Sequence, residues 1–237
     1  MRIADHAALH AACQESRELI PLFVLAPRYF KAGGPQTVPH RLQFLLESLR
    51  ELAHALAERG SKLQIVEGPA SIVLPKLIER WKVERVYTMR SIDPEARARD
   101  EKLKAKLRVP FVAYEHETLT PAGSVKTGSG SAFQVYTPFA RAAMTQLSDV
   151  TALPTPERFP PLPAAALGDG AIPSLQALGL EANPHLQKGG ESVAHARLAE
   201  FAVGPAVKYD IDRDRLDLSG TSRLSADLHF GTLSVRT

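Results

Sequence analysis

The fold is decided by the stretch Leu19-Ile-Pro-Leu-Phe-Val-Leu25, a nearly continuous apolar run. Such a run is expected of a β-strand that is buried on both faces, as the strands of parallel sheets are. Residues 40–59 then change to helical spacing, and Gly60 follows as a C-terminal stop. The apolar stripe of this helix consists of Leu42, Leu45, Leu46, Leu49, Leu52, Ala53 and Leu56. The chain therefore opens on a buried strand and an amphipathic helix.

The alternation continues along the chain. Short strand candidates lie at residues 63–66, 85–88 and 110–114, and helical stretches around 70–81 and 94–107 separate them. Strands and helices of these lengths, in alternation, predict an α/β fold with a parallel, doubly wound sheet and helices on both faces.

Two of these helices carry local signals. Asp93 is placed as an N-cap, Pro94 follows at the first helical position, and Glu95 lies in the first turn, so a helix is expected to begin at residue 94. Pro75 lies inside the 70–81 stretch. Because proline cannot donate the helical hydrogen bond, that helix is expected to start late or to be kinked.

The pattern changes after residue 147. Residues 148–190 are rich in proline and have little periodicity, which is typical of an interdomain connection laid over a surface. Helical spacing resumes at residues 191–201. We therefore divide the chain into an α/β domain at 1–147, a linker at 148–189 and the start of a helical domain at 190–237.

Composition excludes several classes of protein. No run of eighteen apolar residues is present, so we expect no membrane span, and the N-terminus lacks the apolar region of a secretory signal. The single cysteine, Cys13, excludes an intramolecular disulfide and fits a reducing cytoplasm, and its apolar neighbours favour a packed thiol. Eight histidines lack metal-site spacing, so no metal is predicted, and the net charge of +3 is too small to indicate a nucleic-acid partner.

The most specific motif lies near the end of the sequence. Tyr209-Asp-Ile-Asp-Arg213 is followed by Thr221-Ser-Arg-Leu-Ser225, which clusters three hydroxyls where a helix is expected to begin. A helix N-terminus offers unpaired N–H groups and a positive dipole end, which favour a bound phosphate. Serine and threonine are also good N-caps, so the residues alone leave plain capping as the other interpretation.

In order and spacing, this motif resembles the flavin-binding entry of the DNA photolyases and cryptochromes. The resemblance implies that FAD is held by Tyr209 and by Thr221, Ser222, Arg223, Leu224 and Ser225, and that Arg213 contacts DNA. It is supported upstream by Gly190-Glu191 and Phe201, and downstream by Leu228-His-Phe-Gly-Thr-Leu-Ser-Val-Arg236.

The first part of the chain is similar to the same family. Arg2-Ile-Ala-Asp-His-Ala-Ala-Leu9 resembles the opening of photolyases, and Val125-Lys-Thr-Gly-Ser-Gly with Val135-Tyr-Thr-Pro-Phe139 resembles the turn before their linker. The resemblance implies a Rossmann-like sheet, a linker and the first helices of an all-α FAD-binding domain.

Two departures from the family pattern set further expectations. The match starts after the family's first strand, which is central in a 3-2-1-4-5 sheet. The pairs 19–25/63–66 and 85–88/110–114 should therefore form without bonding normally to each other. The match also stops before most of the helical domain, so no catalytic residue is assigned. Trp81, at the end of the 70–81 helical stretch, is expected to be a core residue.

The antenna chromophore stays undecided. In the folate-binding branch an Asn-Glu pair precedes Arg-Ala-Arg-Asp, whereas Glu95-Ala96 precedes Arg97-Ala-Arg-Asp100 here. No folate site is therefore predicted.

The resemblance implies a light-driven carbon–carbon lyase, a deoxyribodipyrimidine photo-lyase that uses reduced FAD to repair cyclobutane pyrimidine dimers in damaged DNA. It further implies a protein that is monomeric when complete, with this chain alone inactive, and the single cysteine and the lack of a secretory signal lead us to expect a cytoplasmic location. The alternative is a cryptochrome-type blue-light receptor that shares the FAD site but signals through partners. A nucleotide-binding α/β module is a more distant alternative, and the motif from Tyr209 to Ser225 argues against it.

Overall fold

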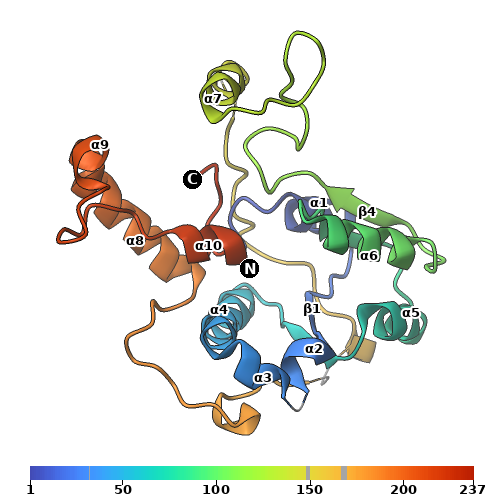
Figure 1. Cartoon of the computed structure of the whole chain (residues 1–237). Helices are drawn as coiled ribbons and strands as arrows, with labels where there is room; N and C mark the ends of the chain where they lie inside the picture. Colours follow the sequence, from blue (N-terminus) through green and yellow to red (C-terminus); the bar gives the residue numbers. More distant parts are fainter. Residues whose placement is uncertain (32, 148–149, 167–169) are drawn as a thin grey trace. The chain divides into compact units, whose positions relative to one another are not determined.

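The protein is described from a computed structural model that covers residues 1–31, 33–147, 150–166 and 170–237 (Figure 1). The chain divides into two compact units, each assembled from separate segments. The first comprises Met1–Arg2, Ile20–Gly68 and Gly168–Leu233, and the second comprises Ile3–Leu19, Pro69–Leu167 and Ser234–Thr237.

The first unit is built on two parallel strands and one long helix. Strand β1 (Leu22–Leu25) pairs in parallel with β2 (Gln64–Glu67), and helix α4 (Pro39–Glu58) connects them after two short helices. These short helices are α2 (Pro27–Phe30) and α3 (Gly34–Thr37). The apolar stripe of α4 forms the core, because its most deeply buried residues are Leu42, Leu46, Leu49 and Leu56.

The rest of the first unit is helical and poorly buried. Its elements are η2 (Gln176–Leu178), α8 (Glu191–Val203), η3 (Pro205–Lys208), α9 (Tyr209–Asp212) and α10 (Ser225–Phe230). Its small core consists of Ala194, Leu224 and Leu233, with Leu198 packed against them.

Helix α4 also fixes the start of α8. The Gly189 amide donates to Glu47 Oε2 at 2.9 Å, and the Ser192 amide donates to Glu51 Oε1 at 2.5 Å. Two carboxylates one helical turn apart thus satisfy free N–H groups at the beginning of α8. Gly190 has a φ of +138°, a backbone conformation that other residues rarely adopt, and a Cβ there would displace the Glu51 carboxylate.

The second unit contains the other strand pair. Strand β3 (Val86–Met89) pairs in parallel with β4 (Phe111–Tyr114), and helix α6 (Pro94–Lys104) connects them. The remaining elements are α1 (Ala7–Glu15), α5 (Ala70–Trp81), α7 (Tyr136–Met144) and η1 (Ala164–Ala166). Helix α1 contacts both strands, and its Glu15 carboxylate accepts from Arg85 Nη1 at 2.6 Å and from the Tyr87 hydroxyl at 2.9 Å.

The predicted elements are confirmed within a few residues. In the described part of the chain the four strands form two separate two-stranded sheets, β1–β2 and β3–β4, as expected. Asp93 caps α6 by accepting from the amides of Glu95 and Ala96 at 3.3 and 3.1 Å. The late start predicted for the helix with Pro75 is wrong, because α5 begins at Ala70 and runs through the proline.

One single-residue expectation is also confirmed, because Trp81 is a core residue at 5% exposure. Cys13, expected to be a packed thiol, is only partly buried. This partial burial raises the pKa of its thiol to about 11, which favours the protonated form at neutral pH. Within the described ranges, no helix combines the length and apolar character that crossing a bilayer requires, and no cluster of metal-binding side chains occurs.

Candidate functional site

The predicted flavin residues lie at the end of the first unit. Tyr209 opens α9, and its ring packs edge-on against Phe201 of α8, with the ring centroids 5.9 Å apart. The tyrosine keeps 43% of its surface exposed. The contact with Phe201 therefore holds the ring in place and leaves part of it accessible to a ligand.

A close backbone contact brings residues 221–225 beside α9. A Cβ added to Gly220 would lie 2.7 Å from the Asp212 carbonyl oxygen and 2.8 Å from Asp212 Cβ. Because backbone atoms cannot give way as a flexible side chain can, residue 220 must be glycine for this contact to form. The structure thus places the Thr221–Ser225 segment next to the helix that begins at Tyr209.

The hydroxyls of this segment do not serve as the helix cap. The N-cap of α10 is Leu224, which makes no side-chain capping bond, and Ser225 is the first helical residue. Thr221 and Ser225 are exposed and Ser222 is partly exposed. Plain capping, the other interpretation of these residues, is therefore not what the structure shows.

Arg223 has an unusual backbone. Its φ is +54°, in the left-handed region that residues other than glycine seldom adopt. Such strain persists only where the surrounding structure enforces it. Here the next residue, Leu224, is buried in the small core of this unit, while the Arg223 side chain is exposed.

A buried carboxylate anchors the segment from the other side. Asp227 on α10 is fully buried and accepts from Arg197 Nη1 of α8, from Gln187 Nε2 at 3.0 Å and from Thr232 Oγ1 at 3.0 Å. The network ties α10 to α8 and to the preceding linker. Sequence reasoning missed it, because a single aspartate on a short helix gives no signal of its distant partners.

Arg213, the predicted DNA contact, lies at the surface. It follows α9, and its Nε lies 3.6 Å from Asp214 Oδ2, with both side chains more than half exposed. An exposed pair of this kind contributes little to stability, and either partner can exchange to another ion. The guanidinium is therefore accessible to a phosphate.

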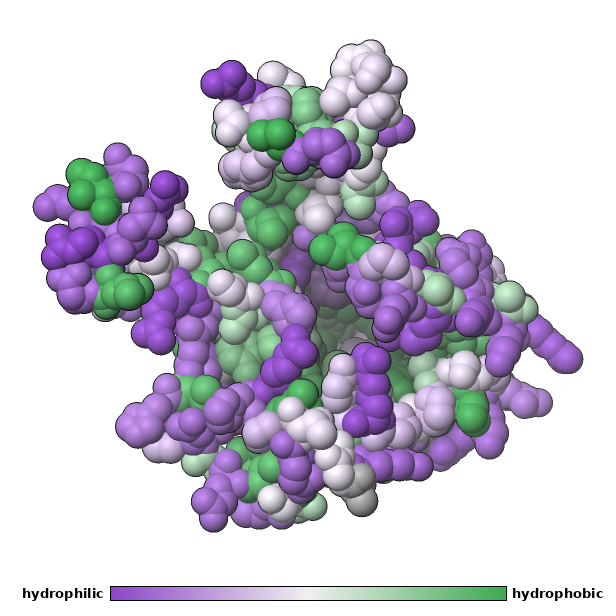
Figure 2. Space-filling view, viewed as in Figure 1, coloured by the Kyte–Doolittle hydropathy of each residue, from purple (hydrophilic) through white to green (hydrophobic). Residues whose placement is uncertain are grey.

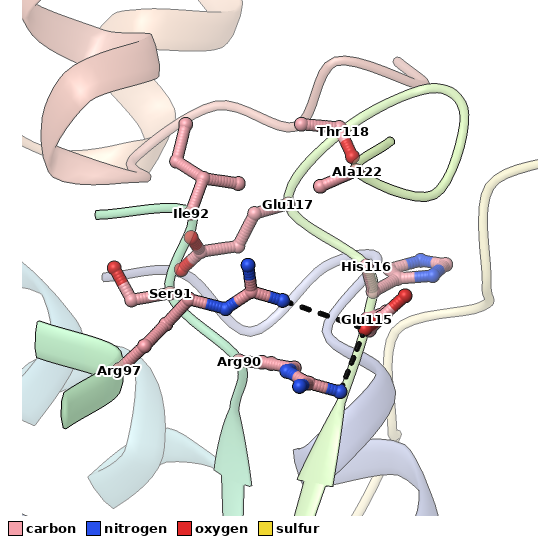
Figure 3. Close-up of a pocket in the computed structure, with 9 residues that line it drawn as sticks. All are labelled: Arg90, Ser91, Ile92, Arg97, Glu115, His116, Glu117, Thr118 and Ala122. Atoms are coloured by element: carbon pink, nitrogen blue, oxygen red, sulfur yellow. Dashed lines mark hydrogen bonds and ion pairs between the residues drawn. The ribbon is translucent and has the colours of Figure 1, made fainter. Parts of the chain in front are cut away.

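The second unit has a pocket at the carboxyl ends of β3 and β4 (Figure 3). Its empty volume, counted together with space open to solvent, is about 230 Å³. The residues that line it are Arg90, Ser91, Ile92, Arg97, Glu115, His116, Glu117, Thr118 and Ala122. Ligands of open α/β sheets bind at this end of the strands. The arginines are already engaged, since Arg90 Nη1 lies 2.8 Å and Arg97 Nη2 3.9 Å from Glu115 Oε1. With Glu117 alongside, the pocket has no excess of positive charge to hold an anion.

One pocket residue belongs to a buried hub around Asp5. Asp5 accepts from His116 Nε2 at 2.8 Å, from the Leu153 amide at 2.8 Å and from the Ser234 hydroxyl. Burial raises the pKa of the Asp5 carboxyl, but the hydrogen bonds from Ser234, His116 and Leu153 lower it more, so the net pKa is below its ordinary value.

The Asp5 hub is structural. Ser234 donates to Asp5 and not to His116, so the serine and histidine are not arranged as a nucleophile and its base. Arg236 adds to the same region by donating to the backbone oxygens of His116 and Thr118. The hub therefore fastens residues 234–236 to the loop that follows β4.

Comparison with known proteins places these features in a family. A family model described as DNA photolyase matches residues 1–161. The chain is similar to a deoxyribodipyrimidine photo-lyase of Thermus thermophilus, with 35% identity over 236 residues that cover all of this chain and 51% of that protein. It is also similar to an uncharacterized 31.6 kDa protein of Synechococcus sp. PCC 6716, with 30% identity over all of this chain and 84% of that protein.

A solved structure agrees over nearly the whole chain. A bacterial class III photolyase of Agrobacterium tumefaciens is 28% identical and superposes with a TM-score of 0.85 over 98% of this chain and 49% of its own. The short Synechococcus protein apart, the chain spans about half the length of the curated photolyases it matches.

Proposed function

This chain belongs to the DNA photolyase family, and from that premise we propose that it supplies the α/β domain and part of the flavin site of a light-dependent lyase. The reaction proposed is the splitting of cyclobutane pyrimidine dimers in damaged DNA. The nearness of residues 221–225 to α9, enforced by the contact of Gly220 with Asp212, is the observation that carries the proposal.

The residues present fit FAD. The Thr221, Ser222 and Ser225 hydroxyls and the Arg223 guanidinium form a set of donors suited to a pyrophosphate, and charged acceptors strengthen such hydrogen bonds. None of these hydroxyls caps α10, and the strained backbone at Arg223 turns the segment beside α9. A donor set left at the surface next to a fixed tyrosine ring is what a cofactor site requires before its ligand is bound.

Each residue has a separate task in this proposal. Tyr209 and residues 221–225 hold the cofactor, Leu224 anchors their segment in the core, and Arg213 binds a phosphate beside the lesion. The chemistry that FAD supplies when bound is donation of one electron to the dimer after excitation by light. No side chain of this chain is assigned a covalent or proton-transfer role.

The chain by itself encloses only one side of such a site. Buried ligand sites gain affinity by covering most of the ligand surface, and Tyr209, Thr221 and Ser225 are all exposed. We therefore expect the purified 237-residue chain to be colourless after desalting and to leave illuminated dimer-containing DNA unrepaired. Retention of stoichiometric FAD by the chain alone would contradict the half-site proposal.

The site is tested in a chimera. It joins residues 1–237 to the second half of the Thermus thermophilus photo-lyase, the part beyond the region matched here. Replacing Ser222 with alanine should weaken FAD binding at least about tenfold, because a hydrogen bond to a charged group contributes roughly 1.5–3 kcal/mol. Ser219, an exposed serine just before Gly220, is the matched control, and its replacement should change nothing.

The same chimera separates dimer repair from the alternative, a cryptochrome-type receptor. The matched proteins include a Cryptochrome DASH of Gloeobacter violaceus at 30% identity. Blue light should restore intact pyrimidines in dimer-containing DNA. A chimera that holds FAD and leaves the dimers unrepaired would favour the cryptochrome-type receptor.

A further inference from the structure

We propose that Arg197 on α8 and Asp227 on α10 are a positioning pair, which sets the rotation of α10 about its axis. In this way the pair fixes the flavin-binding donors at Ser225 and in the residues just before it. The inference rests on the proposed function and deepens it, because neither residue belongs to the motif from Tyr209 to Ser225. Both residues act through the segment that they hold and not by contact with FAD.

Helix α10 buries its aspartate and exposes its leucine. Asp227 is 0% exposed, whereas the next residue, Leu228, is 45% exposed. Figure 2 shows apolar and hydrophilic surface side by side over α8 and α10. A short helix that turned to bury its apolar side chains would place its leucine inward and leave its carboxylate in water. The hydrophobic pattern of α10 therefore does not determine the rotation that the structure shows.

The hydrogen bonds of Asp227 supply this direction. Its Oδ2 accepts from Arg197 Nη1 and from Gln187 Nε2, the latter at 3.0 Å. Its Oδ1 accepts from Thr232 Oγ1 at 3.0 Å. The other terminal nitrogen of Arg197, Nη2, donates to the Lys188 carbonyl at 3.1 Å. Because hydrogen bonds weaken steeply away from their preferred angles, a carboxylate bound at both oxygens permits little rotation of its helix.

Stability alone does not require an ionic anchor at this position. Replacing a buried ion pair with well-packed apolar residues of similar volume is often neutral or stabilising, because each charge loses its hydration on burial. Leu224, three residues before Asp227, is already buried in a small apolar core with Ala194 and Leu233. An apolar pair would extend that core without fixing a rotation, whereas a binding site requires side chains held in one defined geometry.

The same pair controls the charge beside the flavin-binding donors. Asp227 lies two residues after Ser225, in the first turn of α10. An unpaired carboxylate there would repel a pyrophosphate, and burial would keep solvent ions from screening the repulsion. Arg197 compensates this charge by its ion pair with Asp227. Rotation and charge therefore assign the support of residues 221–225 to the same two side chains.

The test compares the apolar replacement of this pair with the same replacement of an exposed pair. One variant carries Arg197→Met with Asp227→Leu. The matched control carries Arg215→Met with Asp217→Leu, in a pair whose side chains are both more than half exposed. Urea unfolding and the amide NMR signals of residues 221–225 are measured on the isolated chain, and FAD affinity is measured in the chimera with the Thermus thermophilus second half.

We expect the Arg197→Met/Asp227→Leu variant to unfold at the urea midpoint of the parent or above it. Its amide signals at 221–225 should shift and broaden, and FAD should bind at least about tenfold more weakly because hydrogen bonds to the charged pyrophosphate are lost. The control should match the parent in all three measurements. Parent-like signals at 221–225 together with parent-like FAD affinity, in a variant that folds, would overturn the inference.

Arg197→Lys decides the question if the double variant does not fold. Lysine keeps the charge, but its ammonium does not reproduce the planar fork with which arginine binds both Asp227 and the Lys188 carbonyl. This variant should fold, shift the signals at 221–225 and weaken FAD binding. If it changes neither the signals nor the affinity, the geometry of the pair has no influence on the site and the inference is wrong.

The NMR measurement separates this inference from the proposed function. A parent chimera that holds no FAD would contradict the proposed function, while shifted signals at 221–225 in the folded double variant would still support the positioning pair. A parent chimera that holds FAD, with no effect of the double variant on these signals or on the affinity, would do the reverse.

Discussion

Replacing Asp227 with alanine should destabilise the first unit more than any other single change in its helical part. The carboxylate is fully buried and accepts from three side chains, those of Arg197, Gln187 and Thr232. Arg197 is itself 17% exposed, so the substitution leaves a largely buried guanidinium whose remaining bond is to the Lys188 carbonyl at 3.1 Å.

The magnitude follows from this geometry. Removing one partner of a buried ion pair costs about 3–5 kcal/mol, because the remaining charge stays buried without compensation. Folded domains are stable by only about 5–15 kcal/mol in total. The loss therefore represents a large share of the stability, and it corresponds to roughly two to three and a half orders of magnitude in the opening equilibrium.

The assay is amide hydrogen exchange resolved by segment, with urea unfolding followed by circular dichroism as the global measure. Protection should fall in α8 and α10, the helices that Asp227 joins, and stay unchanged in β3 and β4 of the second unit. The milder Asp227→Asn should lie between the parent and the alanine variant, because the amide keeps the shape and one acceptor oxygen.

Asp217 provides the matched control. It pairs with Arg215 at 2.6 Å in the same unit, but both side chains are more than half exposed. Asp217→Ala should leave exchange and urea midpoints unchanged, since exposed pairs are screened by solvent. If Asp227→Ala and Asp217→Ala behave alike, the buried network does not stabilise the segment and the reasoning is refuted.

Three further outcomes are expected. Because the folded pKa of Asp5 is lowered, its stabilisation is full above the unfolded value near 3.9 and is lost as pH falls through the folded value. Asp5→Asn should therefore reduce the fall of the urea unfolding midpoint at acid pH. An unchanged fall would mean that other carboxylates cause this loss of stability. Gly220→Ala should destabilise the protein by about 1–3 kcal/mol through the clash with Asp212. Gly128→Ala is the control and should be neutral, because no atom lies within 4 Å of the new Cβ. Equal effects of the two substitutions would contradict the close contact at Gly220. In the chimera, Arg213→Ala should reduce the slope of log DNA affinity against log salt by about one contact, and an unchanged slope would leave Arg213 as a surface charge paired with Asp214.

The amino-acid sequence by itself determined the secondary structure and the family. The apolar run at 19–25 and the stripe from Leu42 to Leu56 appear as a strand and a helix, and Asp93 caps its helix as expected. These signals are local, because hydrophobic period and capping depend on residues within one or two turns of each other. The same local reasoning led to the wrong prediction of a late helix start at Pro75. Propensity alone places a proline at a helix start, whereas the packing of α5 tolerates Pro75 inside the helix.

Only the tertiary structure decided what holds the site in place. Asp227 meets Arg197 across 30 residues, Glu47 meets Gly189 across 142, and Asp5 meets Ser234 across 229. No periodicity links residues so far apart in one sequence, and each partner taken alone is an ordinary surface-type residue. Their pairing follows from burial, because a carboxylate removed from water must find donors, and which donors are near is fixed by how the helices pack.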